Sequence, residues 1–92
     1  MELNDNTEAK KVLSELYTDI NANKDIDKDN YVKDLVLRTY NLINEKYSFT
    51  YLFGRLKDDE HVIKTIKQLR IEDNNYEEQI KFLAKGATYA LY

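Results

Sequence analysis

An apolar stripe with helical spacing recurs four times along the chain and is the feature that most constrains the fold. Apolar residues three or four positions apart form one face of an α-helix, whereas a strand would show strict alternation. The stripes predict helices over about residues 5–21, 30–46, 49–70 and 74–92. Short polar segments join them, which is typical of an all-α domain folded as an antiparallel up-down four-helix bundle. We expect one leucine from each stripe to lie in the core: Leu16, Leu35, Leu56 and Leu83.

In the third stripe, the apolar residues after residues 57–61 fall on a different side of the helix from those before. One continuous helix from Phe49 to Leu69 would turn Asp59 toward the core, where its carboxylate would lose its hydration. We therefore expect a kink or a short break at residues 57–61. Asp58 or Asp59 would then cap a second helical segment.

The segment Ala22 to Asn30, ANKDIDKDN, is polar and predicts a loop, because Asn and Asp compete with helix by bonding their own backbone. Its alternating carboxylates resemble the start of a calcium loop. However, that loop needs a glycine at its sixth position and a glutamate at its twelfth, where this chain has Asn30 and Val36. The aspartates are better interpreted as part of a solvated loop and as a helix cap, so no metal site is expected.

The start of the last helix is marked by an amide followed three residues later by an acid. Asn74 with Glu77, or Asn75 with Glu78, would cap the first turn and place negative charge at its positive end.

The outer face of this last helix carries aromatic residues. Phe82, Lys85 and Tyr89, with Tyr92 at the edge, lie away from the apolar stripe, where a bundle usually exposes polar side chains. Two interpretations remain open. The four residues form a partner-binding surface, or the C-terminal end or the break at residues 57–60 folds over the rings as a small satellite cluster.

Composition excludes several classes of protein. The chain of 92 residues is long enough for one domain, and it has no cysteine or proline, one histidine and a net charge of −3. Disulfide frameworks and Cys/His zinc sites are therefore excluded, and the acidic balance argues against nucleic-acid binding. The sequence has no apolar run of about 20 residues and no signal-peptide pattern at its start, so we expect a cytoplasmic protein.

Catalytic residues are scarce. His61 stands among Asp58, Asp59 and Glu60 at a predicted helix start, which is typical of a solvated residue, and no spacing brings a serine to it. We expect no enzymatic activity and no cofactor. An alternative is a small all-α mutase of the chorismate type, which would hold a dicarboxylate with arginines, here Arg38, Arg55 and Arg70. That fold requires one very long helix, which the loop at residues 22–30 interrupts.

Basic residues recur along the third helical region. Lys57, Lys64, Lys67 and Arg70 are the polar side of an amphipathic helix, or a site for transient contact with acidic lipid headgroups or a charged partner.

Several short motifs together resemble the enterocin A immunity family, small proteins that protect producers of pediocin-like (class IIa) bacteriocins. The motifs are ELYTDI at Glu15–Ile20, LFGRL at Leu52–Leu56, YEEQI at Tyr76–Ile80, Gly86, and ALY at Ala90–Tyr92. Each motif is weakly specific alone, but their order and spacing cover nearly the whole chain. The sequence pI of about 5.1 differs from that of relatives, which are often basic.

The resemblance implies a monomeric cytoplasmic four-helix bundle without catalytic activity. Its implied partner is the membrane component of the mannose phosphotransferase permease with bound bacteriocin, and the C-terminal half would set specificity. A small helical adaptor or regulator of an unrelated pathway is the alternative from a different class.

Overall fold

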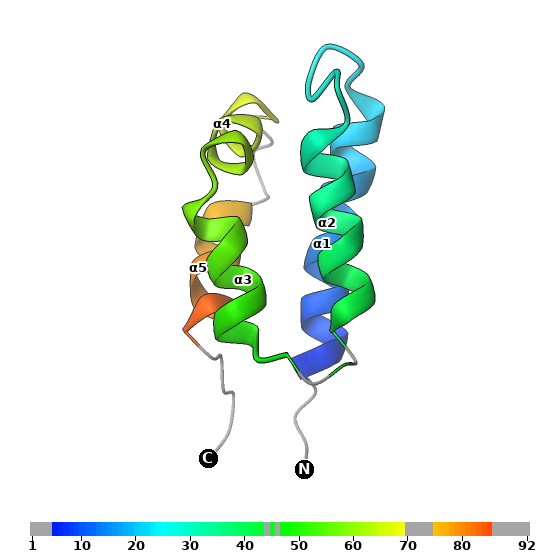
Figure 1. The fold of residues 1–92 in the computed structure, drawn as a ribbon. Coiled ribbons are helices and arrows are strands. Elements are labelled where there is room, and N and C mark those ends of the chain that lie inside the picture. The colour runs from blue at the N-terminus through cyan, green and yellow to red at the C-terminus, as the bar shows by residue number, and fades with distance from the viewer. Residues whose placement is uncertain (1–4, 44, 46, 70–74, 86–92) are drawn as a thin grey trace.

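The computed structural model describes residues 5–43, 45, 47–69 and 75–85, and these residues form helices and connecting turns without any strand (Figure 1). The all-α prediction is confirmed. The described residues contain five helices: α1 (Asp5–Ala22), α2 (Tyr31–Leu42), α3 (Phe49–Asp58), α4 (Glu60–Leu69) and α5 (Tyr76–Ala84).

The helices are arranged as two pairs. In one pair α1 and α2 lie side by side and run in opposite directions, and in the other α3 and α5 do the same (Figure 1). Helix α4 lies at one end of the second pair and is turned away from the direction of α3. The chain is elongated, with principal extents of 41 × 26 × 20 Å.

The predicted break in the third stripe is confirmed. Helix α3 ends at Asp58, Asp59 has an extended backbone with φ −84° and ψ 122°, and α4 begins at Glu60. The Asp59 carboxylate accepts hydrogen bonds from the backbone N–H groups of His61 (2.8 Å) and Val62 (3.2 Å). Asp59 is therefore the cap of α4, and the break places its charge on otherwise unpaired N–H groups instead of in the core.

The loop between α1 and α2 ends in a cap made by the predicted carboxylates. Asp27 accepts from the N–H groups of Val32 and Lys33, both at 2.8 Å, and Asp29 accepts from that of Tyr31 at 3.2 Å. Asp27 and Asn30 have φ of 57° and 63°, a left-handed conformation that Asp and Asn adopt more readily than most residues.

Helix α2 ends at Leu42, earlier than the predicted end near Lys46. The Ile43 N–H bonds the carbonyl of Tyr40, three residues back, as the helix tightens at its end. The buried Ile43 is the last apolar residue of this face before the polar residues at positions 44–46.

A single hydrophobic core lies between the helices. Its buried apolar residues are Ala9, Val12, Leu13, Leu16, Ile20, Val32, Val36, Ile43, Leu52, Phe53, Leu56, Val62, Leu69, Tyr76, Ile80, Leu83 and Ala84. Three of the four predicted core leucines belong to it, but the prediction for Leu35 is wrong. The buried face of α2 follows Val32, Val36, Thr39 and Ile43, and Leu35 lies beside this line, half-buried at the edge of the core.

Candidate partner-binding surface

The outer face of α5 exposes the residues that its helical angle predicts. Tyr76, Ile80, Leu83 and Ala84 are buried, whereas Phe82 is 47% exposed and Lys85 is exposed at the end of the helix. Asn75 caps the helix by accepting from the Glu78 N–H at 3.2 Å, one of the two predicted caps. Tyr89 and Tyr92 lie outside the described residues, so their placement stays a prediction.

Phe82 lines a groove between α5 and α1 with a volume of 380 Å³. The lining residues are Glu8, Val12, Glu78, Gln79, Phe82 and Leu83. The buried Val12 and Leu83 contribute its apolar part, and the exposed carboxylates of Glu8 and Glu78 give it an acidic rim. The break at residues 57–60 contributes no residue to this groove, so the described part of the chain offers no support for a satellite cluster made by the break.

Gln79 brings an unsatisfied acceptor to the same groove. Its side-chain oxygen is buried and accepts no hydrogen bond among the described residues. A buried acceptor without a donor costs free energy, and native proteins leave few of them.

A polar contact also joins α1 and α5. The Tyr76 hydroxyl donates to the carboxylate of Asp19, 57 residues earlier in the chain. Burial raises the pKa of the Tyr76 phenol well above its usual value, and the hydrogen bond to Asp19 and the charges of Asp19 and Glu15 raise it further. This contact was not predicted from the sequence, because helical spacing carries no information about which side chain the Tyr76 hydroxyl would meet.

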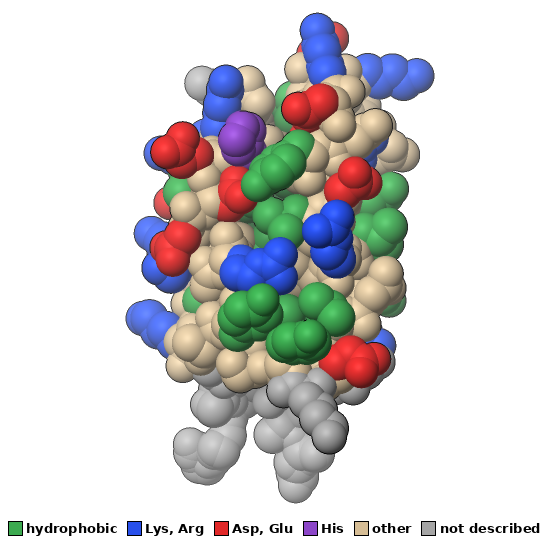
Figure 2. Space-filling model, in the orientation of Figure 1, with side chains coloured by type: hydrophobic (Ala, Val, Ile, Leu, Met, Phe, Trp, Pro, Cys, Tyr) green, Lys and Arg blue, Asp and Glu red, His purple; other side chains and the backbone are tan. Residues whose placement is uncertain are grey.

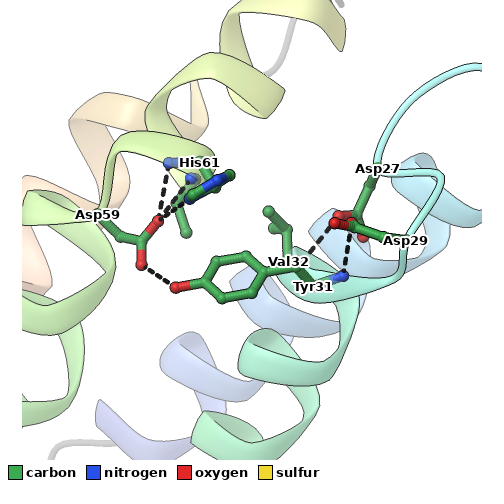
Figure 3. Close-up of polar contacts among 7 residues, drawn as sticks. Asp27, Asp29, Tyr31, Val32, Asp59 and His61 are labelled. Carbon is green, nitrogen blue, oxygen red and sulfur yellow. Dashed lines mark hydrogen bonds and ion pairs between the residues drawn. The ribbon is translucent and has the colours of Figure 1, made fainter.

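The single histidine does not belong to a catalytic triad in the described part of the chain. His61 is exposed, its ring centroid lies 4.6 Å from that of Tyr31, and its Nδ1 lies 3.6 Å from Asp59 Oδ1 (Figure 3). Ser48 Oγ accepts instead from the Tyr51 N–H at 3.1 Å as the cap of α3. Ser14 lines a separate groove between α1 and α2.

Asp59 joins α2 to α4, because it contacts Tyr31 on α2 and the first residues of α4. Burial raises the pKa of its carboxyl, but the hydrogen bond from the Tyr31 hydroxyl, those from the Val62 and His61 N–H groups, and the charge of His61 together lower it below its usual value. The same hydrogen bond to Asp59 raises the pKa of the Tyr31 phenol. Sequence reasoning found the cap but not Tyr31, because the contact joins elements 28 residues apart.

The basic residues of the third stripe do not form one cluster in the described structure. Lys64 and Lys67 line a shallow pocket on α4 with Glu60, whereas Lys57 forms an ion pair with Asp58 at 3.0 Å. Arg70 lies outside the described residues.

Within the described ranges no three His, Cys, Asp or Glu side chains are grouped so that they could hold a metal ion. None of the helices described is both long and apolar enough to cross a membrane.

Comparison of the chain with protein-family models, curated proteins and solved structures gave no match.

Proposed function

We propose that this chain is a bacteriocin immunity protein that protects its producer cell from a cognate class IIa bacteriocin. It would act by binding, from the cytoplasmic side, the membrane component of the mannose phosphotransferase permease with the bacteriocin bound. It would do so as a monomer, without catalysis and without a cofactor.

The observation that carries this proposal is the groove between α1 and α5. It combines an exposed aromatic ring, Phe82, with the unsatisfied acceptor of Gln79 and two rim carboxylates. Aromatic side chains are enriched at the energetic centres of protein interfaces. These properties favour a binding module.

Three of the motifs that carry the resemblance lie within the described residues and contribute to one core. Asp19 of ELYTDI accepts the hydrogen bond of Tyr76 of YEEQI, and Leu16 and Ile80 from the same motifs are buried in the core. Leu52, Phe53 and Leu56 of LFGRL are buried as well. The three motifs thus contribute side chains to the same core.

We further infer that α1, α2, α3 and α5 correspond to the antiparallel four-helix bundle that the resemblance implies. Helix α4 would then be the segment that the break at Asp59 separates from the third helix of that bundle.

The proposal is tested by protection of living cells. The chain is expressed in a strain sensitive to pediocin-like bacteriocins, which is then challenged with a panel of them, the empty vector being the control. Raised resistance to one or a few bacteriocins of the panel is the expected result. Unchanged sensitivity to every one, with the folded protein present in the cells, would overturn the proposal and favour an adaptor of another pathway.

Co-purification separates the two parts of the proposal. The immunity protein should be retained by the detergent-solubilised permease component when the bacteriocin is added, and much less in its absence. Protection without any such complex would leave immunity in place and contradict the proposed partner.

A further inference from the structure

A second surface lies on α2 and α3, away from the groove between α1 and α5. Among the described residues five large hydrophobic side chains are exposed, and three of them are tyrosines of this region: Tyr31 (42%), Tyr47 (47%) and Tyr51 (49%). In Figure 2 hydrophobic side chains cover the lower part of this face, over α2 and α3, and two basic side chains lie directly above them.

The rings are organised and not scattered. Tyr47 and Tyr51 stack with their centroids 5.5 Å apart and their planes at 22°. The guanidinium carbon of Arg55 lies 5.5 Å from the centroid of the Tyr51 ring, one turn back along α3. Tyr47, Tyr51 and Arg55 thus form a continuous stack on the surface. Rings and guanidinium groups held in this way lose little conformational freedom on binding.

Helix α2 adds a second arginine. Arg38 lies two turns after Tyr31, a spacing that places both side chains on one side of the helix, and it is exposed. We call Tyr31, Arg38, Tyr47, Tyr51 and Arg55 the tyrosine–arginine face.

The arginines of this face are not neutralised within the described structure. The ion pairs found there are Lys57–Asp58, His61–Asp59 and Lys81–Glu77, and none involves Arg38 or Arg55. Asp34 lies one turn before Arg38 without pairing with it, and the Asp59 carboxylate is already bonded to Tyr31 and the start of α4. The net charge of the chain is −3, so two guanidinium groups without a carboxylate partner among the described residues make this face more positive than the rest of the chain.

We propose that the tyrosine–arginine face binds an acidic, aromatic-containing segment of a partner protein. Arginine forms paired hydrogen bonds with carboxylates, and tyrosine and arginine are enriched among the residues that dominate binding energy at protein interfaces. An anionic lipid surface fits less well, because lipid recognition of this type uses clusters of about 4–8 basic residues. This face has only two arginines, and the acid Asp34 lies between Tyr31 and Arg38 along α2. The inference stands independently of the proposed immunity function.

A random copolymer of glutamate and tyrosine serves as the probe, with binding followed by fluorescence anisotropy at low salt. We expect the wild-type chain to bind it and the double variant Arg38→Gln/Arg55→Gln to bind about fivefold or more weakly, which corresponds to about 1 kcal/mol or more of binding free energy. The matched control is Lys64→Gln/Lys67→Gln, which also removes two positive charges, but from α4. It should change the affinity less than about twofold. Absence of wild-type binding, or equal loss in both double variants, would overturn the proposal.

Amide chemical shifts of the wild-type chain give a second measurement that does not depend on any variant. Addition of the copolymer should shift resonances of α2 and α3 near the five residues of the face. Shifts confined to α4 or α5 would overturn the proposal. The same titration with vesicles of equal parts phosphatidylcholine and phosphatidylglycerol should leave these resonances unchanged. Binding of the vesicles through the same residues would assign the face to a lipid surface instead.

Discussion

The hydroxyl of Tyr31 donates a 2.6 Å hydrogen bond to Oδ2 of Asp59, and so ties the first residue of α2 to the start of α4 (Figure 3). The other oxygen of the same carboxylate caps α4 through the N–H groups of His61 and Val62. One side chain therefore fixes both the break after α3 and the position of α4 against α2. The exposed ring of His61 packs on Tyr31 beside this contact.

Replacement of Asp59 separates the capping role from the charge. Asp59→Ala removes the acceptor of two backbone N–H groups and should destabilise the protein by about 1 kcal/mol, as the loss of a helix cap does. Asp59→Asn keeps a side-chain oxygen that caps almost equally well, so it should cost much less. Urea denaturation of both variants measures the difference. Equal losses would mean that the cap matters less than the charge or the second oxygen, which accepts from Tyr31.

The hydroxyl of Tyr76 predicts a loss of stability at alkaline pH. The pKa of Tyr76 is raised in the folded protein, so its neutral form stabilises the fold fully below the usual phenol pKa of about 10. Above that pH the unfolded chain loses the proton while the folded chain keeps it, and stability falls as pH rises. Urea denaturation between about pH 9 and 11 should show this decline.

Tyr76→Phe is the control for this effect, since it keeps the ring and removes the ionisable group. The variant should be less stable than the wild type near neutral pH, because Asp19 loses its donor. Its stability should fall less between pH 9 and 11. A parallel decline in both proteins would contradict the assignment to Tyr76.

The core leucines give the largest expected effects. Leu16→Ala, Leu56→Ala and Leu83→Ala each remove a fully buried side chain and should cost about 2–5 kcal/mol of the free energy of unfolding. Leu35→Ala should cost less than any of these, because Leu35 is half-buried at the edge of α2. Chemical denaturation of the four variants measures the order. Leu35→Ala as the most damaging change would contradict the burial described here.

Local features of the fold could be predicted from the sequence, and features that depend on neighbouring helices could not. The break at Asp59 and the caps at Asp27, Asn75 and Asp59 follow from polar residues placed against a helical stripe. The error at Leu35 arose because a broad apolar face does not reveal which of its edges a neighbouring helix covers.

The candidate site also has features that could be predicted from the sequence and features that could not. The exposure of Phe82 and Lys85 follows from their angle on one helix. The groove depends on α1 lying beside α5, and the contacts Tyr31–Asp59 and Tyr76–Asp19 span 28 and 57 residues. Helical periodicity carries no information about such pairings. The stack between Tyr47, just before α3, and Tyr51 within α3 was not predicted from the sequence.

Phe82 gives the sharpest test of the partner-binding surface. Phe82→Ser, alone or with Tyr89→Ser, should abolish or strongly reduce protection against the cognate bacteriocin while the helical content is retained. The matched control is Leu37→Ser on α2, which removes an apolar side chain with the same exposure of 47% from another helix. Both single variants should stay within about 0.5 kcal/mol of the wild-type stability, as surface substitutions usually do. Full protection by folded Phe82→Ser, or an equal loss of protection in Leu37→Ser, would rule out this surface. If Phe82→Ser unfolds while Leu37→Ser stays folded, a satellite cluster that packs on the ring would be favoured instead.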